Sequence, residues 1–144
     1  MYKITKREEV LRSPVYPIPT IDKPIMTLIV DMIRTMKANG GCGLAAPQIG
    51  IAKALVIATI QDKYHIAFIN PRITWRSEEV EKMEEGCLSC TERVVVERAK
   101  EIEVSYTSFQ GILKLEKFKG IDARILQHEI DHLNGKLIVD YKEI

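Results

Sequence analysis

The stretch Gln127-His128-Glu129-Ile130-Asp131-His132-Leu133-Asn134-Gly135 carries two of the three histidines of the chain. Four residues of an α-helix turn the chain by about 400°, so the rings of His128 and His132 should share one face and can hold one metal ion. Glu129 should then lie beside the ion without binding it, as a general base in metal-assisted hydrolysis does. The alternative is a charged, solvated helix with a chance spacing. The use of two of three histidines in this pattern favours the metal site.

A catalytic site of this kind needs a third protein ligand and one open position for water or substrate. Zinc proteases supply the ligand downstream, as a histidine six residues after the second one or as a glutamate on a following helix. Here the first position holds Ile138, and the sequence up to Ile144 leaves no room for that helix. Both protease patterns fail, so the third ligand is expected upstream.

Composition predicts one domain over residues 1–144, because 144 residues at 46% hydrophobic content can bury a sufficient core. The 21 Lys and Arg against 20 Asp and Glu give a net charge of +1, which favours neither nucleic acid nor an anionic membrane as partner. The sequence has no apolar run long enough for a membrane span and no signal segment, so a cytoplasmic location is expected. Three cysteines favour a reducing compartment and a chemical use for a thiol.

Periodicity predicts an α+β domain of short antiparallel strands, framed by an early helix and by the late helix with the two histidines. An extended arm is expected over residues 7–21, and a helix from Asp22 to Asn39 with Thr20 or Asp22 as its cap. Strands are expected at 54–60, 64–69, 73–75 and 80–83, and a hairpin at 102–106 with 112–115. His65 lies in a strand without ligand spacing and is not expected to bind metal.

Residues 41–50 are rich in glycine and alanine and fit neither helix nor strand by pattern. Small residues let another backbone approach closely, whether a neighbouring strand or a bound peptide. Gln48 is the one strong polar side chain of this segment. Its amide is either a solvated turn group or a donor to a developing oxyanion.

Cys87 and Cys90 form a C-x-x-C pair that fits neither common use of this motif. A zinc ribbon needs a second pair, and a thioredoxin-type pair opens a helix, whereas residues 91–96 are expected to continue as a strand. Cys87 follows Gly86 and two carboxylates that could orient ligands or water. It is therefore the better candidate for the third metal ligand.

Three motifs together resemble the peptide deformylases: Gly41-Cys42-Gly43-Leu44-Ala45-Ala46-Pro47-Gln48, Glu85-Gly86-Cys87-Leu88-Ser89 and Gln127-His128-Glu129-Ile130-Asp131-His132-Leu133. The early helix and the expected strand end at Asn70-Pro71 also fall where the family has them. The resemblance thus covers nearly the whole chain. It implies a minimal form without the C-terminal helix of longer relatives.

This resemblance implies a hydrolase that removes the formyl group from the N-terminal formyl-methionine of newly synthesised polypeptides and releases formate. It assigns Cys87, His128 and His132 as metal ligands, Glu129 as catalytic acid and base, and Gln48 with the backbone N–H of Leu88 as oxyanion donors. The family uses Fe(II), with zinc, nickel or cobalt as possible substitutes, whereas the ligand types alone favour zinc.

The resemblance also implies that the peptide lies beside Cys42, Gly43 and Leu44 in strand fashion. The methionine side chain would enter a pocket lined by Cys42, Met83, Ile121, Ile125 and His128. The chain is expected to act as a monomer.

The sequence departs from the family pattern at three places. Cys90 and Thr91 replace an aliphatic or aromatic residue and a proline, and Cys42 replaces an aliphatic residue. Arg124 takes a position that is often apolar, which leaves the shape of the methionine pocket open.

Two alternative functions are a binding module without turnover and a peptidase or amidase that uses the same metal site. A non-catalytic relative should have lost Glu129, Gln48 or a ligand, and none is lost.

Overall fold

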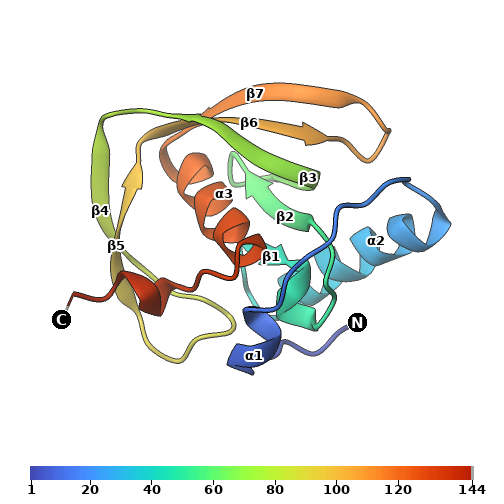
Figure 1. Cartoon of the computed structure of the whole chain (residues 1–144), viewed down its shortest axis with the longest axis horizontal. Coiled ribbons are helices and arrows are strands. Elements are labelled where there is room, and N and C mark those ends of the chain that lie inside the picture. Colours follow the sequence, from blue (N-terminus) through green and yellow to red (C-terminus); the bar gives the residue numbers. More distant parts are fainter. Residues whose placement is uncertain (144) are drawn as a thin grey trace.

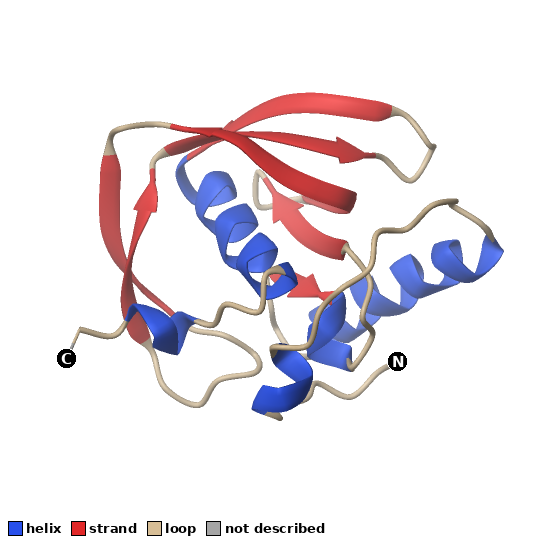
Figure 2. Cartoon of the chain, in the orientation of Figure 1, coloured by secondary structure: helices blue, strands red, loops and turns tan. Residues whose placement is uncertain are grey.

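A computed structural model describes residues 1–143 of the chain (Figures 1 and 2). The helices are α1 (Glu8–Leu11), α2 (Lys23–Ala38) and α3 (Gly120–Leu133), with short 3-10 turns η1 (Ala46–Ile49) and η2 (Ile138–Tyr141). The strands are β1 (Gly43–Ala45), β2 (Leu55–Ile60), β3 (Tyr64–Arg76), β4 (Val80–Glu85), β5 (Val94–Ala99), β6 (Glu101–Thr107) and β7 (Leu113–Lys119). This is the α+β arrangement that the sequence predicts.

The strands form two antiparallel sheets that surround α3 (Figure 1). Five strands in the order β1-β2-β3-β6-β7 make the larger sheet, and β4 pairs with β5 in the smaller one. Figure 2 shows β4 and β5 flanking α3 on one side, while β3, β6 and β7 pass over it. The two sheets thus hold α3 at the centre of the molecule.

The two larger clusters of the core share strand β2. Leu55 and Ile57 pack with α2, whereas Val56 and Ala58 point to the opposite face and pack with α3. A strand covered on both faces reads as one continuous apolar run, which is how residues 54–60 appear in the sequence. The strands around α3 bury most of this helix, including His128 and His132. The solvated-helix alternative is therefore wrong.

The early helix follows its sequence signals. The carboxylate of Asp22 accepts a hydrogen bond of 3.0 Å from the backbone N–H of Ile25, as an N-cap does. Asp22, not Thr20, is therefore the cap of α2. Its apolar stripe is buried, with Met32 and Met36 fully inaccessible.

Three local predictions are wrong. The expected arm contains the short helix α1, and residues 43–49, expected to be neither helix nor strand, form β1 and η1. The strand from residue 64 does not end at Asn70 but continues to Arg76 with a register shift, so residues 73–75 are not a separate strand. Asn70 has φ 52° and its side chain bonds the backbone N–H and C=O of Ile18 at 2.7 and 2.8 Å. The turn-like residue thus makes a bulge and binds the N-terminal segment.

The segment after Cys87 is also different from its prediction. It forms a turn in which the N–H of Cys90 bonds the carbonyl of Cys87 at 3.1 Å, and the next strand begins only at Val94.

The 16 residues of α2 make it the longest helix described in residues 1–143, and no helix there is long and apolar enough to cross a membrane.

Candidate active site

Three side chains converge at the end of the pocket that α3 borders. One ligand atom from each of Cys87, His128 and His132 lies within 4.8 Å of the others. The two histidines stand one turn apart on α3 with ring centroids 5.2 Å apart, and Cys87 follows β4 with its Sγ 3.4 Å from Nε2 of His132. A thiolate and two imidazoles make a set for one metal ion with an open position. The helical spacing predicted the two histidines, and Cys87 was the better candidate for the third ligand.

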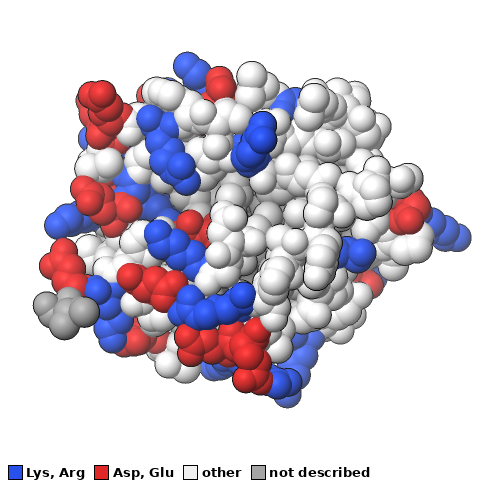
Figure 3. Space-filling model, viewed as in Figure 1, with Lys and Arg blue, Asp and Glu red and all other residues white. Residues whose placement is uncertain are grey.

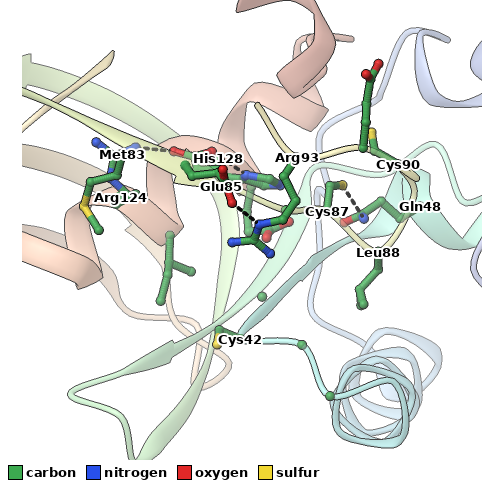
Figure 4. A pocket seen from close by; sticks show the side chains of 18 of the residues that line it. Cys42, Gln48, Met83, Glu85, Cys87, Leu88, Cys90, Arg93, Arg124 and His128 are labelled. Atoms are coloured by element: carbon green, nitrogen blue, oxygen red, sulfur yellow. Dashed lines mark hydrogen bonds and ion pairs between the residues drawn. The ribbon is translucent and has the colours of Figure 1, made fainter. Parts of the chain in front are cut away.

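A set of four charged residues, the buried ion network, lies behind the histidines: Glu85, Arg98, Arg124 and Asp131. One oxygen of Glu85 lies 2.9 Å from Nδ1 of His128, which fixes that ring. Arg98 donates to both oxygens of Glu85 at 2.9 Å and to Asp131 at 2.6 Å. Arg124 donates to Glu85 at 2.5 Å (Figure 4). The carboxylate that orients His128 is therefore itself held by two guanidinium groups.

The site favours a positive charge near the two rings. Burial opposes the charge on Glu85, but hydrogen bonds with Arg98 and His128 lower the pKa of this carboxyl to about 2. Burial also opposes a charge on His128, but Glu129 and hydrogen-bonded neighbours raise its pKa to about 10. Burial and the charge of His128 lower the pKa of His132 to about 3. The carboxylates beside these rings thus favour a cation at this place.

The charges around this group fit a divalent cation. In the buried ion network two carboxylates face two guanidinium groups, so the network balances itself. On the pocket side, Glu129 and Cys87 offer two further groups of types that bind cations. Within residues 1–143, Oε1 of Glu129 and Nδ1 of His132 are buried without a hydrogen-bond partner. Buried polar atoms of this kind normally have partners, and a water or an ion beside Glu129 would supply one for its Oε1.

Glu129 lies beside the ligands rather than among them, as the motif predicts. Burial raises the pKa of its carboxyl to about 7, close to the pH at which a general base works best. The carboxylate also lies against Gly43 of β1, where a Cβ would approach Oε2 of Glu129 to 2.5 Å. Gly43 therefore makes room for Glu129, a role that differs from the peptide contact expected from the sequence.

Gln48 is 2% exposed and points at the metal ligands from η1. Its oxygen accepts the N–H of Ala45 at 2.9 Å, and its Nε2 donates to Ser89 at 3.2 Å and to Cys87 Sγ at 3.6 Å. The solvated-turn interpretation is therefore wrong. Leu88 adjoins Cys87, and among residues 1–143 its backbone N–H has no acceptor. Both N–H groups lie next to the metal ligands.

A pocket of about 630 Å³ opens onto these residues (Figure 4). Its wall includes all five residues that the resemblance assigns to the methionine pocket: Cys42, Met83, Ile121, Ile125 and His128. Leu44 is different, because its side chain is fully buried in the core with α2. Leu44 therefore does not line the pocket.

Arg124 does not place its charge in the pocket. Its guanidinium bonds Glu85, the carbonyl of Val96 at 3.1 Å and the carbonyl of Glu81 at 2.6 Å. These contacts tie α3 to β4 and β5. The charge of Arg124 thus belongs to the buried ion network.

The two extra cysteines lie on different sides of the pocket (Figure 4). Cys90 belongs to the same turn as Cys87 and packs beside the small apolar cluster of Val94, Val96 and Ile138. Cys42 is exposed on the β1 side. His65 lies outside the site, with Nδ1 3.0 Å from the hydroxyl of Thr59.

Sequence reasoning missed most of the buried ion network. Arg98 follows Val94 and Val96 at alternate positions of β5, so the period of two places it on the buried face. That signal could have identified it. Asp131 stands inside the histidine motif, but its partner Arg98 comes from a distant strand, and no local pattern shows the pairing.

Comparisons with known proteins place this architecture in one family. The family model described as polypeptide deformylase matches residues 1–143. A peptide deformylase of Pseudothermotoga lettingae is 44% identical over 134 residues, which cover 92% of this chain and 77% of that protein. The crystal structure of the Thermotoga maritima peptide deformylase matches with a TM-score of 0.94 at 40% identity, covering 100% of this chain and 99% of that one. A peptide deformylase from Synechococcus elongatus in complex with actinonin matches with a TM-score of 0.94 at 37% identity, covering 99% and 79%. The chain belongs to the polypeptide deformylase family.

Proposed function

We propose that this chain removes the formyl group from the N-terminal formyl-methionine of newly made polypeptides. The observation that carries the proposal is a buried carboxylate with a free oxygen, Glu129, beside a three-ligand metal group at the end of a pocket. Family membership identifies the reaction as a deformylation. The residues of this chain supply the individual steps.

Cys87, His128 and His132 would hold one divalent metal ion. Such an ion supplies Lewis acidity, which polarises the formyl oxygen and lowers the pKa of a bound water. Glu85 keeps the ring of His128 in place, because Arg98 and Arg124 keep that carboxylate charged and fixed. We propose Fe(II) as the resident ion on the basis of the family resemblance.

Glu129 would act first as base and then as acid. Its carboxylate takes a proton from the attacking water and later gives a proton to the departing amine of methionine. A pKa near neutrality suits a group that must both accept and donate. Gly43 leaves the space in which this carboxylate stands.

Gln48 and Leu88 would stabilise the oxyanion that forms on the formyl group. The Nε2 of Gln48 is held next to Cys87 because its oxygen is fixed by the N–H of Ala45. A donor that is fixed before the reaction pays no reorganisation cost during it, and one such donor is worth about 3 kcal/mol of barrier.

The peptide would lie along Cys42 and Gly43, with its methionine side chain between Met83, Ile121 and Ile125. These residues line the pocket and are largely apolar, as an unbranched thioether side chain requires.

The reaction would take place in the compartment where translation starts with formyl-methionine. The monomeric state stays a prediction for light scattering to test.

The proposed function is tested with formyl-Met-Ala-Ser and its acetylated counterpart, using anaerobically purified protein. Formate release from the first peptide should exceed acetate release from the second by at least about tenfold, since one methyl group is worth about 10–200-fold in a fitted pocket. Metal analysis of the same sample should find one Fe(II) per chain. Cleavage of a peptide bond instead of the formyl amide would identify a peptidase, and absence of turnover in the metal-loaded protein would identify a binding module.

A further inference from the structure

The C-terminal turn η2 packs on the buried ion network through one hydroxyl. The O–H of Tyr141 donates to Oδ2 of Asp131 at 2.6 Å, and the same hydroxyl lies 3.2 Å from Nη1 of Arg98. Arg98 meets that oxygen of Asp131 at 2.6 Å. Tyr141, Asp131 and Arg98 therefore form a closed triangle of hydrogen bonds. Figure 1 shows the C-terminal segment running from the end of α3 toward β5, which brings Tyr141 to this place.

The triangle connects to both metal-binding histidines. Arg98 continues to Glu85, which lies 2.9 Å from Nδ1 of His128. Asp131 is the residue directly before His132 on α3, so a shift of Asp131 also moves the second ring. The hydroxyl of Tyr141 thus helps to fix two of the three metal ligands, although Tyr141 itself does not line the pocket.

The ring of Tyr141 is held independently of its hydroxyl. The guanidinium of Arg98 lies 4.9 Å from the ring centroid and Nζ of Lys136 lies 4.2 Å from it. Asp140 further anchors the turn by ion pairing with Arg12 at 2.7 Å. A phenylalanine at position 141 would keep these contacts and lose only the two hydrogen bonds of the hydroxyl, the one it donates to Asp131 and the one it accepts from Arg98. This separation makes the role of the hydroxyl testable.

We propose that Tyr141 is a positioning residue, whose hydroxyl fixes Asp131 and Arg98 and thereby the orientation of His128 and His132. The proposal rests on the proposed function for its kinetic consequence. Its structural consequence concerns metal retention and stands without it. Partners of this kind behind metal ligands typically change metal affinity or activity by about 10–100-fold.

The test compares Tyr141→Phe with Tyr106→Phe. Tyr106 is a buried tyrosine whose hydroxyl donates to Glu116 within the large sheet, away from the pocket, so the control loses the same type of hydrogen bond. Both variants should lower the thermal midpoint to a similar extent. Only Tyr141→Phe should release metal to a chelator about tenfold faster and alter the absorption spectrum of the cobalt-substituted protein.

In steady-state assays Tyr141→Phe should lower kcat about three- to tenfold and leave KM within about twofold, because the hydroxyl acts on the ligands and not on the peptide. In an Asp131→Asn background, Tyr141→Phe should have little further effect on metal release, because coupled residues are not additive. Equal metal release and equal cobalt spectra in the two single variants would overturn the proposal. If the wild type failed to deformylate but Tyr141→Phe alone released metal faster, the proposed function would fail and the positioning role would stand.

Discussion

The two sides of α3 differ in whether their buried polar groups have hydrogen-bond partners. On the side toward β5, the amide of Gln127 bonds both the N–H and the C=O of Ala99 at 3.2 and 2.9 Å, and the buried ion network engages Asp131 and His128. On the pocket side, Oε1 of Glu129 has no partner within residues 1–143. One helix thus has a paired side and an open side.

The difference shows how one helix can be both rigid and reactive. A buried polar atom without a partner costs about 1–3 kcal/mol, so a fold keeps such atoms only where something else will pair with them. On the paired side the polar groups have partners, so this cost does not arise, and their hydrogen bonds fix α3 against β5. The open side keeps its free atoms where an ion, water and substrate would enter. Figure 3 shows charged side chains of both signs gathered toward the left and the lower edge of one face, whereas Glu129 lines the pocket.

The largest expected effect concerns the thiol that completes the metal group. Cys87→Ala should lose the metal and all measurable turnover, whereas Cys90→Ala should keep both, because only the Cys87 thiol belongs to the group of three. Metal content after desalting and formate release measure the two outcomes. Metal loss from the Cys90 variant with retention by the Cys87 variant would show that Cys90, and not Cys87, is the ligand.

A smaller effect tests the space on the open side. In Gly43→Ala the new methyl group would approach Glu129 Oε2 to 2.5 Å, so the carboxylate must move. A displacement of this size should reduce kcat about a hundredfold while the metal stays bound. Gly41→Ala is the matched control, because its methyl group meets only the end of the Leu88 side chain at 2.8 Å. Equal losses in the two variants would mean that Glu129 does not need this place.

The smallest effect concerns air. Oxygen should inactivate the Fe(II) form by oxidising the ion, or by oxidising two thiols to a disulfide between Cys87 and a flanking cysteine. Nickel should slow the first route only. Half-lives in air are compared for the iron and nickel forms of wild type and of a Cys42→Ile, Cys90→Val double variant, with differences of several-fold expected. Four equal half-lives would exclude both the iron assignment and the role of the extra thiols.

The sequence was sufficient for the parts of the site that depend on local spacing. His128, Glu129 and His132 lie on one short piece of helix, and helical geometry alone predicts how they stand. The early helix and β2 follow from periodicity in the same way. The C-x-x-C pair beside carboxylates indicated Cys87, and the family resemblance supplied the pocket residues, of which the structure turns only the Leu44 side chain away.

The rest depends on partners that are distant in sequence. Asn70 and the following proline have the sequence pattern of a strand end. In the structure the Asn70 amide binds Ile18, and the strand continues beyond it. Arg124 lines the pocket, as its place in the sequence suggests, but the pairing of its charge with Glu85, 39 residues away, was not foreseen. Such pairings arise only when the chain is folded, so no pattern along the sequence contains them.

We propose that Glu129, on the open side, performs proton transfer while the paired side and Cys87 hold the metal. The most direct measurement is formate release from formyl-Met-Ala-Ser by Glu129→Gln, with the metal content of the same sample. Glutamine keeps the shape of the side chain and cannot carry the proton, so kcat should fall by about 10²–10⁴-fold at unchanged metal content. Turnover within a few-fold of wild type at full metal occupancy would contradict the account.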